Sequence, residues 1–528
     1  MELWNGLLKP LRRRAYLSTG ERKIFQRCVA LSRRIRVLEV VRPAAGGMKK
    51  HVQGLVQGLD KDRFEVFLAA PKDEESSQWA GMEGVECIPL EISGRTPAPG
   101  DVIACLKLRN LIKAVRPDIC HFHGFKAAAI GRVAVALCSS SVPVKFRWHS
   151  GASTTERSAS NVSVVNVEGA ELAAADVGTA TGSVVRSAVA PQVVYTVHNS
   201  ALSRSDAHLS PPSFSIGEHL LPASCSASAA RSSITRPTRF HCSASKGRFS
   251  ILKDLFDLSR FQGKMCLYTE HALARFTHRV IAVSQGIYQE YSAIPRLGPG
   301  KVRHIPNGID LKQFCMITLS ESQRREKAKK DMGCAIGIPV VGLVSRLIPH
   351  KGVKTFLLAM ASLRQVGLAP QVLIAGDGPS RVELEAFSLG LGLGNQVRFL
   401  GFIDDMVSFY AALDVFVLSS LSEGMPLSLI EAMAAGVPVV ATRTGGVEEV
   451  VSTSAGGSEG VTISDRGRLV PPGDPEAMAA CIRNALLFPH ESRMLADKAR
   501  AYVRENFSLG EMVRKTEEVY EEVLACRD

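Results

Sequence analysis

Short apolar runs alternate along most of the chain with stretches that repeat with a helical period. In the first half the runs are rich in β-branched residues and are closed by turn-forming residues, which predicts strands. These strands are expected at Ile35–Val41, Phe64–Ala70, Val85–Leu90, Ile119–Phe122, Val193–Val197 and Val280–Val283. Helices are expected at Met48–Leu59 and Lys126–Leu137. Such alternation predicts a parallel sheet with crossover helices, an α/β layer.

A second series of the same kind begins near residue 338. Its strands are expected at Val340–Val344, Gln371–Ala375, Val397–Leu400, Asp414–Leu418 and Val437–Ala441. Pro426 at the first helical position and Gly436 just past the end are expected to bracket one of its helices. The fold class is therefore α/β, with two doubly wound, Rossmann-like domains that hold a ligand in the cleft between them.

This pattern divides the chain into five segments. They are a basic leader at 1–34, an N-terminal domain at 35–310, a linker at 311–337, a C-terminal domain at 338–500 and a last helical segment at 501–528. Two stretches of the N-terminal domain, about 145–190 and 199–250, break the rhythm, and the second contains 14 serines. Because neither stretch can bury enough apolar surface to offset chain entropy, both are expected to be long insertions of low complexity.

The location of the positive charge along the sequence limits which partners are expected. The chain has 528 residues and a net charge of +13, but residues 1–36 hold +8 of it and residues 199–250 hold +4. A groove that follows nucleic-acid phosphates needs basic residues on the folded body, so nucleic acid is not an expected partner. The 12 cysteines contain no CxxC pair, which disfavours a zinc ribbon or a disulfide framework and favours a reducing, cytoplasmic compartment.

The leader adds a question about membranes. No apolar run reaches the ~18 residues of a membrane span. Apolar residues at helical spacing nevertheless stand beside basic ones within residues 1–30, as in a helix that lies on anionic lipid, although Pro10 interrupts the helix. The leader either contacts the cytoplasmic membrane face peripherally, or it is disordered or packs on the body of the protein.

Two glutamates eight residues apart give the strongest chemical signal. Glu423 stands in the loop after a strand and Glu431 on the following helix, so both can face one cavity. The backbone amides of Gly424 and Met425, next to Pro426, lie at the positive end of that helix, which suits an anion or a sugar hydroxyl. Taken alone, such a pair is more often a solvated carboxylate and a loop turn.

Two basic residues and a glycine pair also stand in loops that follow strands, as Glu423 does. Arg346 and Lys351 follow a strand, and two cations at a strand-to-helix junction can clamp a diphosphate without a metal. Gly46 and Gly47 follow the first strand, where a glycine pair lets the backbone approach a ligand closely.

Histidines mark the other side of the expected cleft. His121 and His123 are two residues apart on a strand, so both side chains point to the same face of the sheet. The sequence indicates no third metal ligand beside them, and no metal site is expected. His198 ends a strand and is expected to protrude at the cleft. Satisfied structural histidines are the alternative for all three.

Taken in order, these residues resemble glycosyltransferase family 4, the retaining nucleotide-sugar transferases of the GT-B fold. The resemblance covers about three quarters of the chain. The matching segments are Gly46-Gly47-Met48, His121-Phe-His-Gly124, Thr196-Val-His198, Arg279-Val-Ile-Ala-Val-Ser284, Pro306-Asn-Gly-Ile-Asp310, Gly342-Leu-Val-Ser-Arg346 with Lys351-Gly, and Glu423-x7-Glu431. His278 departs from the family pattern, which has an acidic residue there.

The resemblance assigns roles to these residues. It implies that Arg346 and Lys351 hold the donor diphosphate, that Glu423 contacts the transferred sugar and that Glu431 bonds the ribose. Gly46 and Gly47 would meet the phosphates and His198 would lie beside the sugar, with Gly424, Met425 and Pro426 at the donor. It also implies retention of anomeric configuration, no cofactor, no divalent metal, and a last helix that crosses back to the N-terminal domain.

The expected partners are a nucleotide-sugar donor and a sugar, lipid-linked or small-molecule acceptor in polysaccharide or cell-envelope synthesis. Two alternatives remain open at this point. A GT-B nucleotide-sugar epimerase would release free epimerised sugar without any acceptor, and an inactive scaffold would bind donor without turnover.

Overall fold

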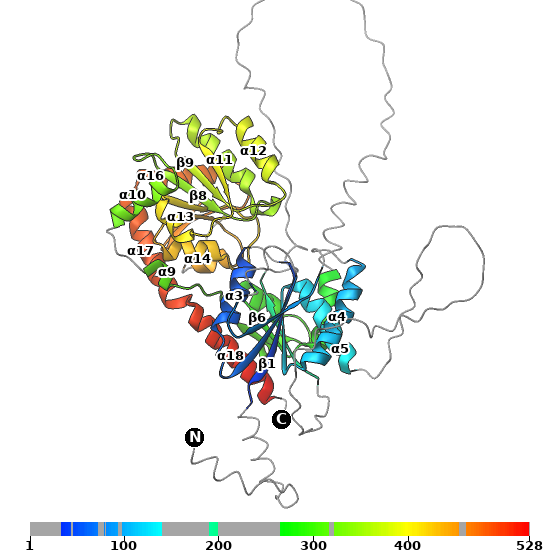
Figure 1. The fold of residues 1–528 in the computed structure, drawn as a ribbon. Helices are drawn as coiled ribbons and strands as arrows, with labels where there is room; N and C mark the ends of the chain where they lie inside the picture. The colour runs from blue at the N-terminus through cyan, green and yellow to red at the C-terminus, as the bar shows by residue number, and fades with distance from the viewer. Residues whose placement is uncertain are drawn as a thin grey trace, which may run out of the picture.

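Two seven-stranded sheets, each covered by helices on both faces, make up the computed structural model (Figure 1). The structure describes residues 33–43, 46–71, 79, 81–92, 98–139, 190–198, 265–315, 321–452 and 461–526. Residues 1–32 of the leader, the insertion expected at 199–250 and all but the last residue of that expected at 145–190 lie outside the described residues.

The N-terminal sheet is parallel throughout, in the order β3-β2-β1-β4-β5-β6-β7. Its strands are β1 (Ile35–Val41), β2 (Phe64–Ala70), β3 (Val85–Pro89), β4 (Ile119–His123), β5 (Gln192–Val197), β6 (Arg279–Ala282) and β7 (Val302–His304). Its helices are α3 (Gly47–Gly58), α4 (Gly100–Val115), α5 (Phe125–Ser139), η4 (Ala274–Phe276), α7 (Gln285–Ser292) and α8 (Gly298–Lys301). The inner strands β4 and β5 are buried at every position, which is why they appear in the sequence as nearly continuous apolar runs.

The C-terminal sheet repeats this plan in the order β10-β9-β8-β11-β12-β14-β13, and only β13 is antiparallel to its neighbour. Its strands are β8 (Val340–Val344), β9 (Gln371–Ala375), β10 (Val397–Gly401), β11 (Val415–Leu418), β12 (Val439–Thr442), β13 (Thr462–Ser464) and β14 (Gly467–Val470). Its helices are α9 (Lys312–Cys315), α10 (Glu321–Asp331), η5 (Pro349–Lys351), α11 (Val353–Gln365), α12 (Arg381–Gly390), α13 (Met406–Ala412), α14 (Leu427–Ala434), α15 (Gly446–Val451), α16 (Pro475–Leu487) and α17 (Pro489–Asn506). The two doubly wound domains expected from the sequence are therefore confirmed.

The strand order fixes where a ligand can bind. In each sheet the first strand lies in the interior, and successive strands are added first on one side of it and then on the other. The order therefore switches between β1 and β4 in the first sheet and between β8 and β11 in the second. Loops that leave the carboxyl ends of such a strand pair diverge and open a crevice. The residues singled out for donor binding stand in the loops and first helical turns after β1, β8 and β11.

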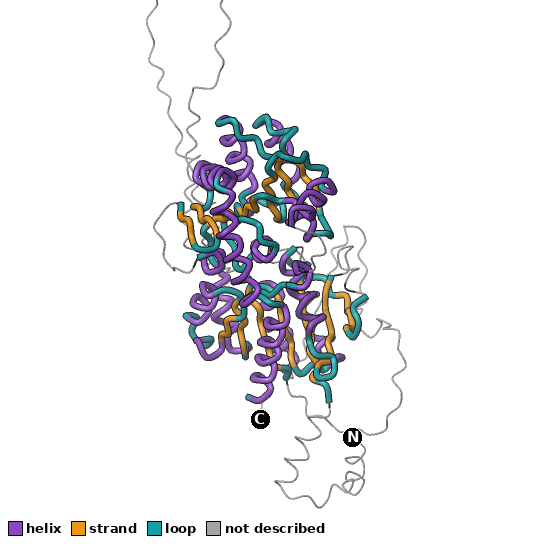
Figure 2. The backbone as a smooth tube through the Cα atoms, turned by 90° about the vertical axis from the view of Figure 1, so that its left-hand side faces the viewer, coloured by secondary structure: helices purple, strands orange, loops and turns teal. Residues whose placement is uncertain are grey.

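The last helix joins the two halves of the molecule. Helix α18 (Leu509–Ala525) begins at Ser508, whose side chain accepts the backbone N–H of Glu511, and it packs against α3. Figure 2 shows this helix lying along the N-terminal domain with the C-terminus at its far end. The expected return of the last helix to the N-terminal domain is confirmed.

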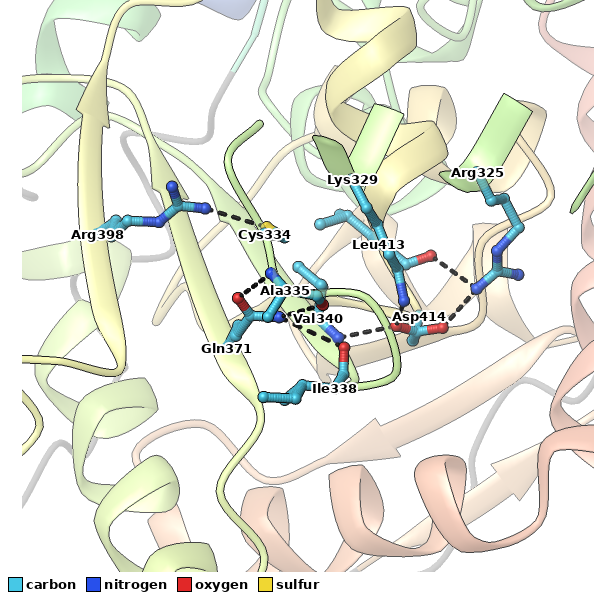
Figure 3. A network of polar contacts seen from close by, with 10 residues as sticks. All are labelled: Arg325, Lys329, Cys334, Ala335, Ile338, Val340, Gln371, Arg398, Leu413 and Asp414. Carbon is cyan, nitrogen blue, oxygen red and sulfur yellow. Dashed lines mark hydrogen bonds and ion pairs between the residues drawn. The ribbon is translucent and has the colours of Figure 1, made fainter. Parts of the chain in front are cut away.

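The segment expected as a linker, 311–337, contains two helices. Arg325 and Lys329 of α10 donate to the two carboxylate oxygens of Asp414, at 2.5 and 2.7 Å, and the backbone N–H of Val340 donates to the same carboxylate at 2.8 Å (Figure 3). Asp414 stands just before β11. These contacts tie α10 to the start of two central strands, so this helix is part of the C-terminal domain.

Several local predictions need correction. Pro426 is the N-cap of α14 and the first helical residue is Leu427, because the ψ of Pro426, 115°, is extended rather than helical. Gly436 follows the helix with φ 74°, as expected of a glycine just past a helix end.

Strands β7, β13 and β14 did not stand out in the sequence because each has only three or four residues. Among the described helices none is long and apolar enough to span a membrane.

Candidate functional site

Glu423 and Lys351 form an ion pair at the carboxyl ends of the central C-terminal strands. Lys351 Nζ lies 2.5 Å from Glu423 Oε1, and Ser420 Oγ donates to the same carboxylate oxygen at 2.6 Å. The side chain of Glu423 is only 7% exposed. The loops after β8 and β11 meet here, because Ser419 Oγ donates to the carbonyl of Lys351 at 2.8 Å. The structure thus brings together two residues that the sequence placed 72 positions apart.

Arg346 offers an unpaired guanidinium beside this ion pair. It stands two residues after the end of β8 and is half-buried, and its side chain makes no hydrogen bond or ion pair within the described part of the chain. A half-buried cation without a partner attracts an anionic ligand, since a charge-assisted hydrogen bond would satisfy it. This geometry suits a diphosphate.

Glu431 faces the N-terminal domain from α14. Its Oε1 lies 2.6 Å from Lys50 Nζ of α3, and its Oε2 accepts the hydroxyl of Tyr410 at 2.9 Å. The first of these contacts crosses between the two domains, and α3 and α14 stand opposite each other in Figure 1. Glu423 and Glu431 therefore both border the space between the domains.

Glycines allow the loops around the site to pack closely. Gly46 has φ 72°, and a Cβ on Gly47 would lie 3.8 Å from Leu427 at the start of α14. A Cβ on Gly445 would lie 2.3 Å from the carbonyl oxygen of Glu423, and one on Gly446 would lie 1.9 Å from that of Gly424. Real Cβ atoms do not come so close to a carbonyl oxygen, so both positions need glycine to shape the loop that carries Glu423. Asn307 supports the same loop by donating to the carbonyl of Met425 at 2.8 Å.

Histidines and one glutamate form a buried polar network in the N-terminal domain. His198 Nε2 lies 3.5 Å from His123 Nδ1, and His123 Nε2 lies 2.8 Å from Glu39 Oε2. The ring nitrogens of His121 contact Tyr520 Oη and Thr196 Oγ1, each at 2.6 Å. His121 and His123 do point to one face of β4, as their spacing predicted.

Glu39 carries the charge of this network. Burial by itself raises the pKa of the carboxyl, but the charges and hydrogen bonds of His121 and His123 outweigh it and hold the pKa well below its ordinary value. Tyr520 of α18 also donates to Glu39 Oε1, at 2.7 Å. The histidine pKa values are lowered as well, and burial is the largest cause that lowers the pKa of His123 to about 4 and that of His198 well below its ordinary value.

His278, the departure from the family pattern, joins β5 to the start of β6. Its Nδ1 accepts the backbone N–H of Val193 at 2.9 Å, and its backbone N–H donates to the carbonyl of Val193 at 3.0 Å.

Three residues of the site were missed in the sequence. Glu39 had a visible signal, since it is a charged residue inside the apolar run of β1, whereas Lys50 and His51 belong to an ordinary amphipathic helix. The sequence indicated no third metal ligand beside His121 and His123, but the fold brings Glu39 and His51 close to these rings. Ligand atoms of His51, His123 and His198 lie within 4.8 Å of one another, and so do those of Glu39, His121 and His123.

Comparison with known proteins identifies this arrangement. The family described as "Glycosyl transferases group 1" matches residues 325–502, and "Glycosyl transferase 4-like domain" matches residues 46–212. The two matches lie in order on the two domains.

Both domains of the chain match glycosyltransferase family models.

Curated relatives of this family cover part of the chain. The GDP-mannose-dependent monoacylated α-(1-6)-phosphatidylinositol monomannoside mannosyltransferase of Corynebacterium glutamicum is 32% identical over 162 residues, 29% of this chain and 41% of the relative. The MMP α-(1→4)-mannosyltransferase of Mycolicibacterium hassiacum is 29% identical over 258 residues, 48% of this chain and 56% of the relative. The matches thus span about half the length of these relatives.

Solved structures share the fold over nearly the whole chain. The HepE protein of Anabaena in complex with UDP and glucose has a TM-score of 0.60 at 18% identity and covers 92% of this chain and 99% of its own. Sucrose-phosphate synthase of Thermosynechococcus elongatus has a TM-score of 0.61 at 20% identity and covers 93% of this chain and 100% of its own. At these identities the likeness establishes the GT-B fold.

Proposed function

We propose that this protein is a retaining glycosyltransferase that moves a sugar from a nucleotide-sugar donor to a sugar or lipid-linked acceptor. The observation that carries the proposal is the set of charged groups at the strand ends of the C-terminal domain, where Lys351 pairs with Glu423 and Glu431 reaches Lys50 of the other domain. The resemblance of the sequence to the family implies a donor contact at both glutamates and at Arg346, Lys351 and His198.

The cations would act on the leaving group. In the transfer step the bond between the anomeric carbon and the β-phosphate oxygen breaks, and its electron pair leaves with the nucleoside diphosphate. Arg346 and Lys351 would stabilise the negative charge that grows on this phosphate, and preorganised contacts of this kind are stronger in the transition state than in the ground state. Two cations supply the charge that a divalent metal would otherwise supply, so we propose metal-independent transfer.

The carboxylates and the histidine would hold the sugar. Glu423 would release Lys351 to the phosphate and accept hydroxyl groups of the transferred sugar, while Glu431 would accept the ribose hydroxyls. His198 would contact the sugar from the N-terminal domain. The acceptor hydroxyl then attacks the anomeric carbon from the face that the phosphate leaves, and its proton passes to the departing phosphate oxygen. This geometry retains the anomeric configuration.

The donor and acceptor are proposed only by class. The relative from Corynebacterium glutamicum is named as dependent on GDP-mannose, and HepE is described with UDP and glucose, which support a nucleoside-diphosphate sugar. We also propose that residues 1–30, which lie outside the described residues, bring the enzyme to anionic lipid near a lipid-linked acceptor.

A nucleotide-release assay tests the function. Purified full-length protein is incubated with GDP-mannose, UDP-glucose and other UDP, GDP and ADP sugars, with and without membrane extract, and the anomeric configuration of the product is determined by NMR. Release of nucleotide that depends on an acceptor, with retained configuration, is expected. Free epimerised sugar without acceptor would instead indicate an epimerase, and donor binding without turnover on any acceptor would indicate a scaffold.

A further inference from the structure

Three imidazoles meet at the edge of the cleft in the N-terminal domain. His51 comes from α3, His123 from the end of β4 and His198 from the residue after β5. The His51 ring stands edge-on to that of His198 with centroids 4.6 Å apart, and to that of His123 with centroids 5.8 Å apart. One nitrogen of each ring lies within 4.8 Å of the other two. The group, called here the histidine cluster, is buried except at His198, which is half-buried.

The hydrogen bonding of this cluster is incomplete. His51 Nδ1 and the amide oxygen of Asn307 are both buried without a hydrogen bond of good geometry in the described part of the chain. The two side chains nevertheless face each other, since a hydrogen bond with Asn307 acts to raise the pKa of His51. His121 differs, because both of its ring nitrogens already have partners at 2.6 Å. The incompleteness is therefore at His51, on the cleft side of His123.

The separation of the ring nitrogens fits a tetrahedral ion. His123 Nδ1 and His198 Nε2 lie 3.5 Å apart. Two imidazole nitrogens bound to zinc at ~2.0–2.1 Å in tetrahedral geometry stand about 3.4 Å from each other. The ligand nitrogen of His51 lies within 4.8 Å of the other two, so it supplies the third imidazole of the set.

The surroundings of His123 favour a metal as well. Its other nitrogen, Nε2, is held by the buried carboxylate of Glu39 at 2.8 Å. Metal-binding histidines commonly donate their second N–H to a carboxylate, which fixes the ring and makes the ligand nitrogen more basic. Glu39 also supplies a negative charge, which offsets the nearby positive charge of Arg42.

We propose that His51, His123 and His198 form a binding site for a transition-metal ion of the zinc type. An all-imidazole set selects Zn²⁺, Co²⁺, Ni²⁺ or Cu²⁺ over Mg²⁺ and Ca²⁺, which prefer oxygen ligands. A metal here would withdraw His198 from the donor sugar, so it would inhibit transfer rather than support it. This inhibitory consequence, unlike binding itself, rests on the proposed function.

The binding experiment uses full-length protein stripped of metal and does not depend on activity. Zn²⁺ is titrated by calorimetry and Co²⁺ by absorption spectroscopy. The wild type is expected to bind one Co²⁺ with the intense visible bands of a tetrahedral site. His51→Gln should weaken Zn²⁺ binding by about tenfold or more. His490→Gln, which removes an exposed histidine of α17, should leave Zn²⁺ binding unchanged. Equal Zn²⁺ affinity of His51→Gln and the wild type, or no tetrahedral Co²⁺ spectrum, would overturn the site.

A measurement on the wild type alone covers the case in which His51→Gln does not fold. X-ray absorption of the Zn²⁺ complex should give a first shell of nitrogen and oxygen with imidazole scattering. A shell that contains sulfur would place the ion on cysteines and overturn the proposal.

The inhibitory consequence is tested separately. Micromolar Zn²⁺ should raise the donor KM of the wild type, EDTA should reverse the effect, and His51→Gln should be less sensitive. Imidazole-bound metal together with unchanged transfer would overturn inhibition. A protein that binds the metal through imidazoles but transfers no sugar would overturn the proposed function and leave the site standing.

Discussion

Lys50 Nζ lies 2.6 Å from Glu431 Oε1, and this contact closes an ion pair across the two domains. Lys50 stands in the first turn of α3, three residues after Gly47, and Glu431 is buried on α14. Lys351 and Glu423 are paired in the same way within the C-terminal domain. Both carboxylates of the candidate site thus pair with lysines, and on the proposed function a nucleotide sugar must replace an ammonium group at each.

Removing Lys50 should ease that replacement at the ribose. Lys50→Met keeps the aliphatic stem and removes the charge. Since half-exposed ion pairs contribute about 0.2–1 kcal/mol, the donor KM should fall about two- to fivefold while kcat stays the same. Steady-state kinetics measure this, with Lys354→Met, which removes the exposed pair with Glu383, as the matched control. A large rise in the donor KM would mean that Lys50 itself contacts the donor.

Loss of the donor contacts should stop transfer without unfolding the protein. Arg346→Ala, Lys351→Ala and Glu423→Ala each remove a charge-assisted contact, at a cost of about 2–4 kcal/mol in the transition state. The expected fall in kcat/KM is about 30- to 1000-fold, with melting temperatures close to that of the wild type. Arg500→Ala, on the surface of α17, is the control and should retain full activity. Wild-type turnover in all three variants would contradict the assignment of these residues to the donor-binding site.

Chelation should not reduce transfer. Because Arg346 and Lys351 are proposed to neutralise the diphosphate, the rate in EDTA should equal or exceed the rate in untreated protein. The nucleotide-release assay measures it directly. Activity that is lost in EDTA and returns with Mg²⁺ would contradict the proposed mechanism.

Glu449 should make stability depend on pH in a predictable direction. It stands on α15, and its Oε2 accepts the backbone N–H of Gln285 at 2.8 Å across the domains, with His304 Nε2 3.9 Å from its other oxygen. Burial raises its pKa from an ordinary 4.5 to about 7. Between these values the folded protein holds a proton that the unfolded chain releases. The contribution to stability is therefore full below pH 4.5 and is lost as the pH rises through about 7.

Glu449→Gln isolates this effect, because it keeps an acceptor oxygen and removes the titration. The stability of the variant relative to the wild type should increase from pH 4.5 to 7 by on the order of 1–2 kcal/mol, after allowance for partial solvent exposure, and then stay constant. Denaturant unfolding at a series of pH values measures the difference. A difference that does not change with pH would show that this carboxyl titrates normally.

The leader should confer affinity for anionic lipid. Basic residues near a charged surface each contribute about 1 kcal/mol, and residues 1–36 carry a net +8. Full-length protein should therefore sediment with anionic liposomes at low salt, less at high salt, and less again when residues 1–30 are deleted. Full-length protein that ignores the liposomes would favour a soluble acceptor.

The repeating strand-and-helix units of both domains could be predicted from the sequence. Strands such as Val340–Val344 and Gln371–Ala375 were placed at their observed limits, because buried parallel strands are apolar along their whole length. The convergence of Lys351 and Glu423 followed from the rule that loops at a switch point meet.

What the sequence could not give are contacts that depend on the relative position of distant elements. The partner of Glu431 is Lys50, 381 residues away, and nothing in the amphipathic pattern of α3 distinguishes Lys50 from its neighbours. The same holds for His51, whose role depends on two strands that lie beside α3 only in the folded domain. Residues that meet across a domain interface do not recur at a regular spacing in the sequence. An analysis of hydrophobic and polar periodicity therefore does not detect them.

Helix α18 has a consequence for the order in which the protein is made. Met512, Val519 and Tyr520 pack into the same core as Val52 and Phe64, and Tyr520 also reaches the carboxylate of Glu39. The N-terminal domain therefore lacks one wall of its core until residues 509–525 have been synthesised. An N-terminal fragment that ends near residue 310 would expose this apolar surface to water, and the two domains must mature together rather than one after the other.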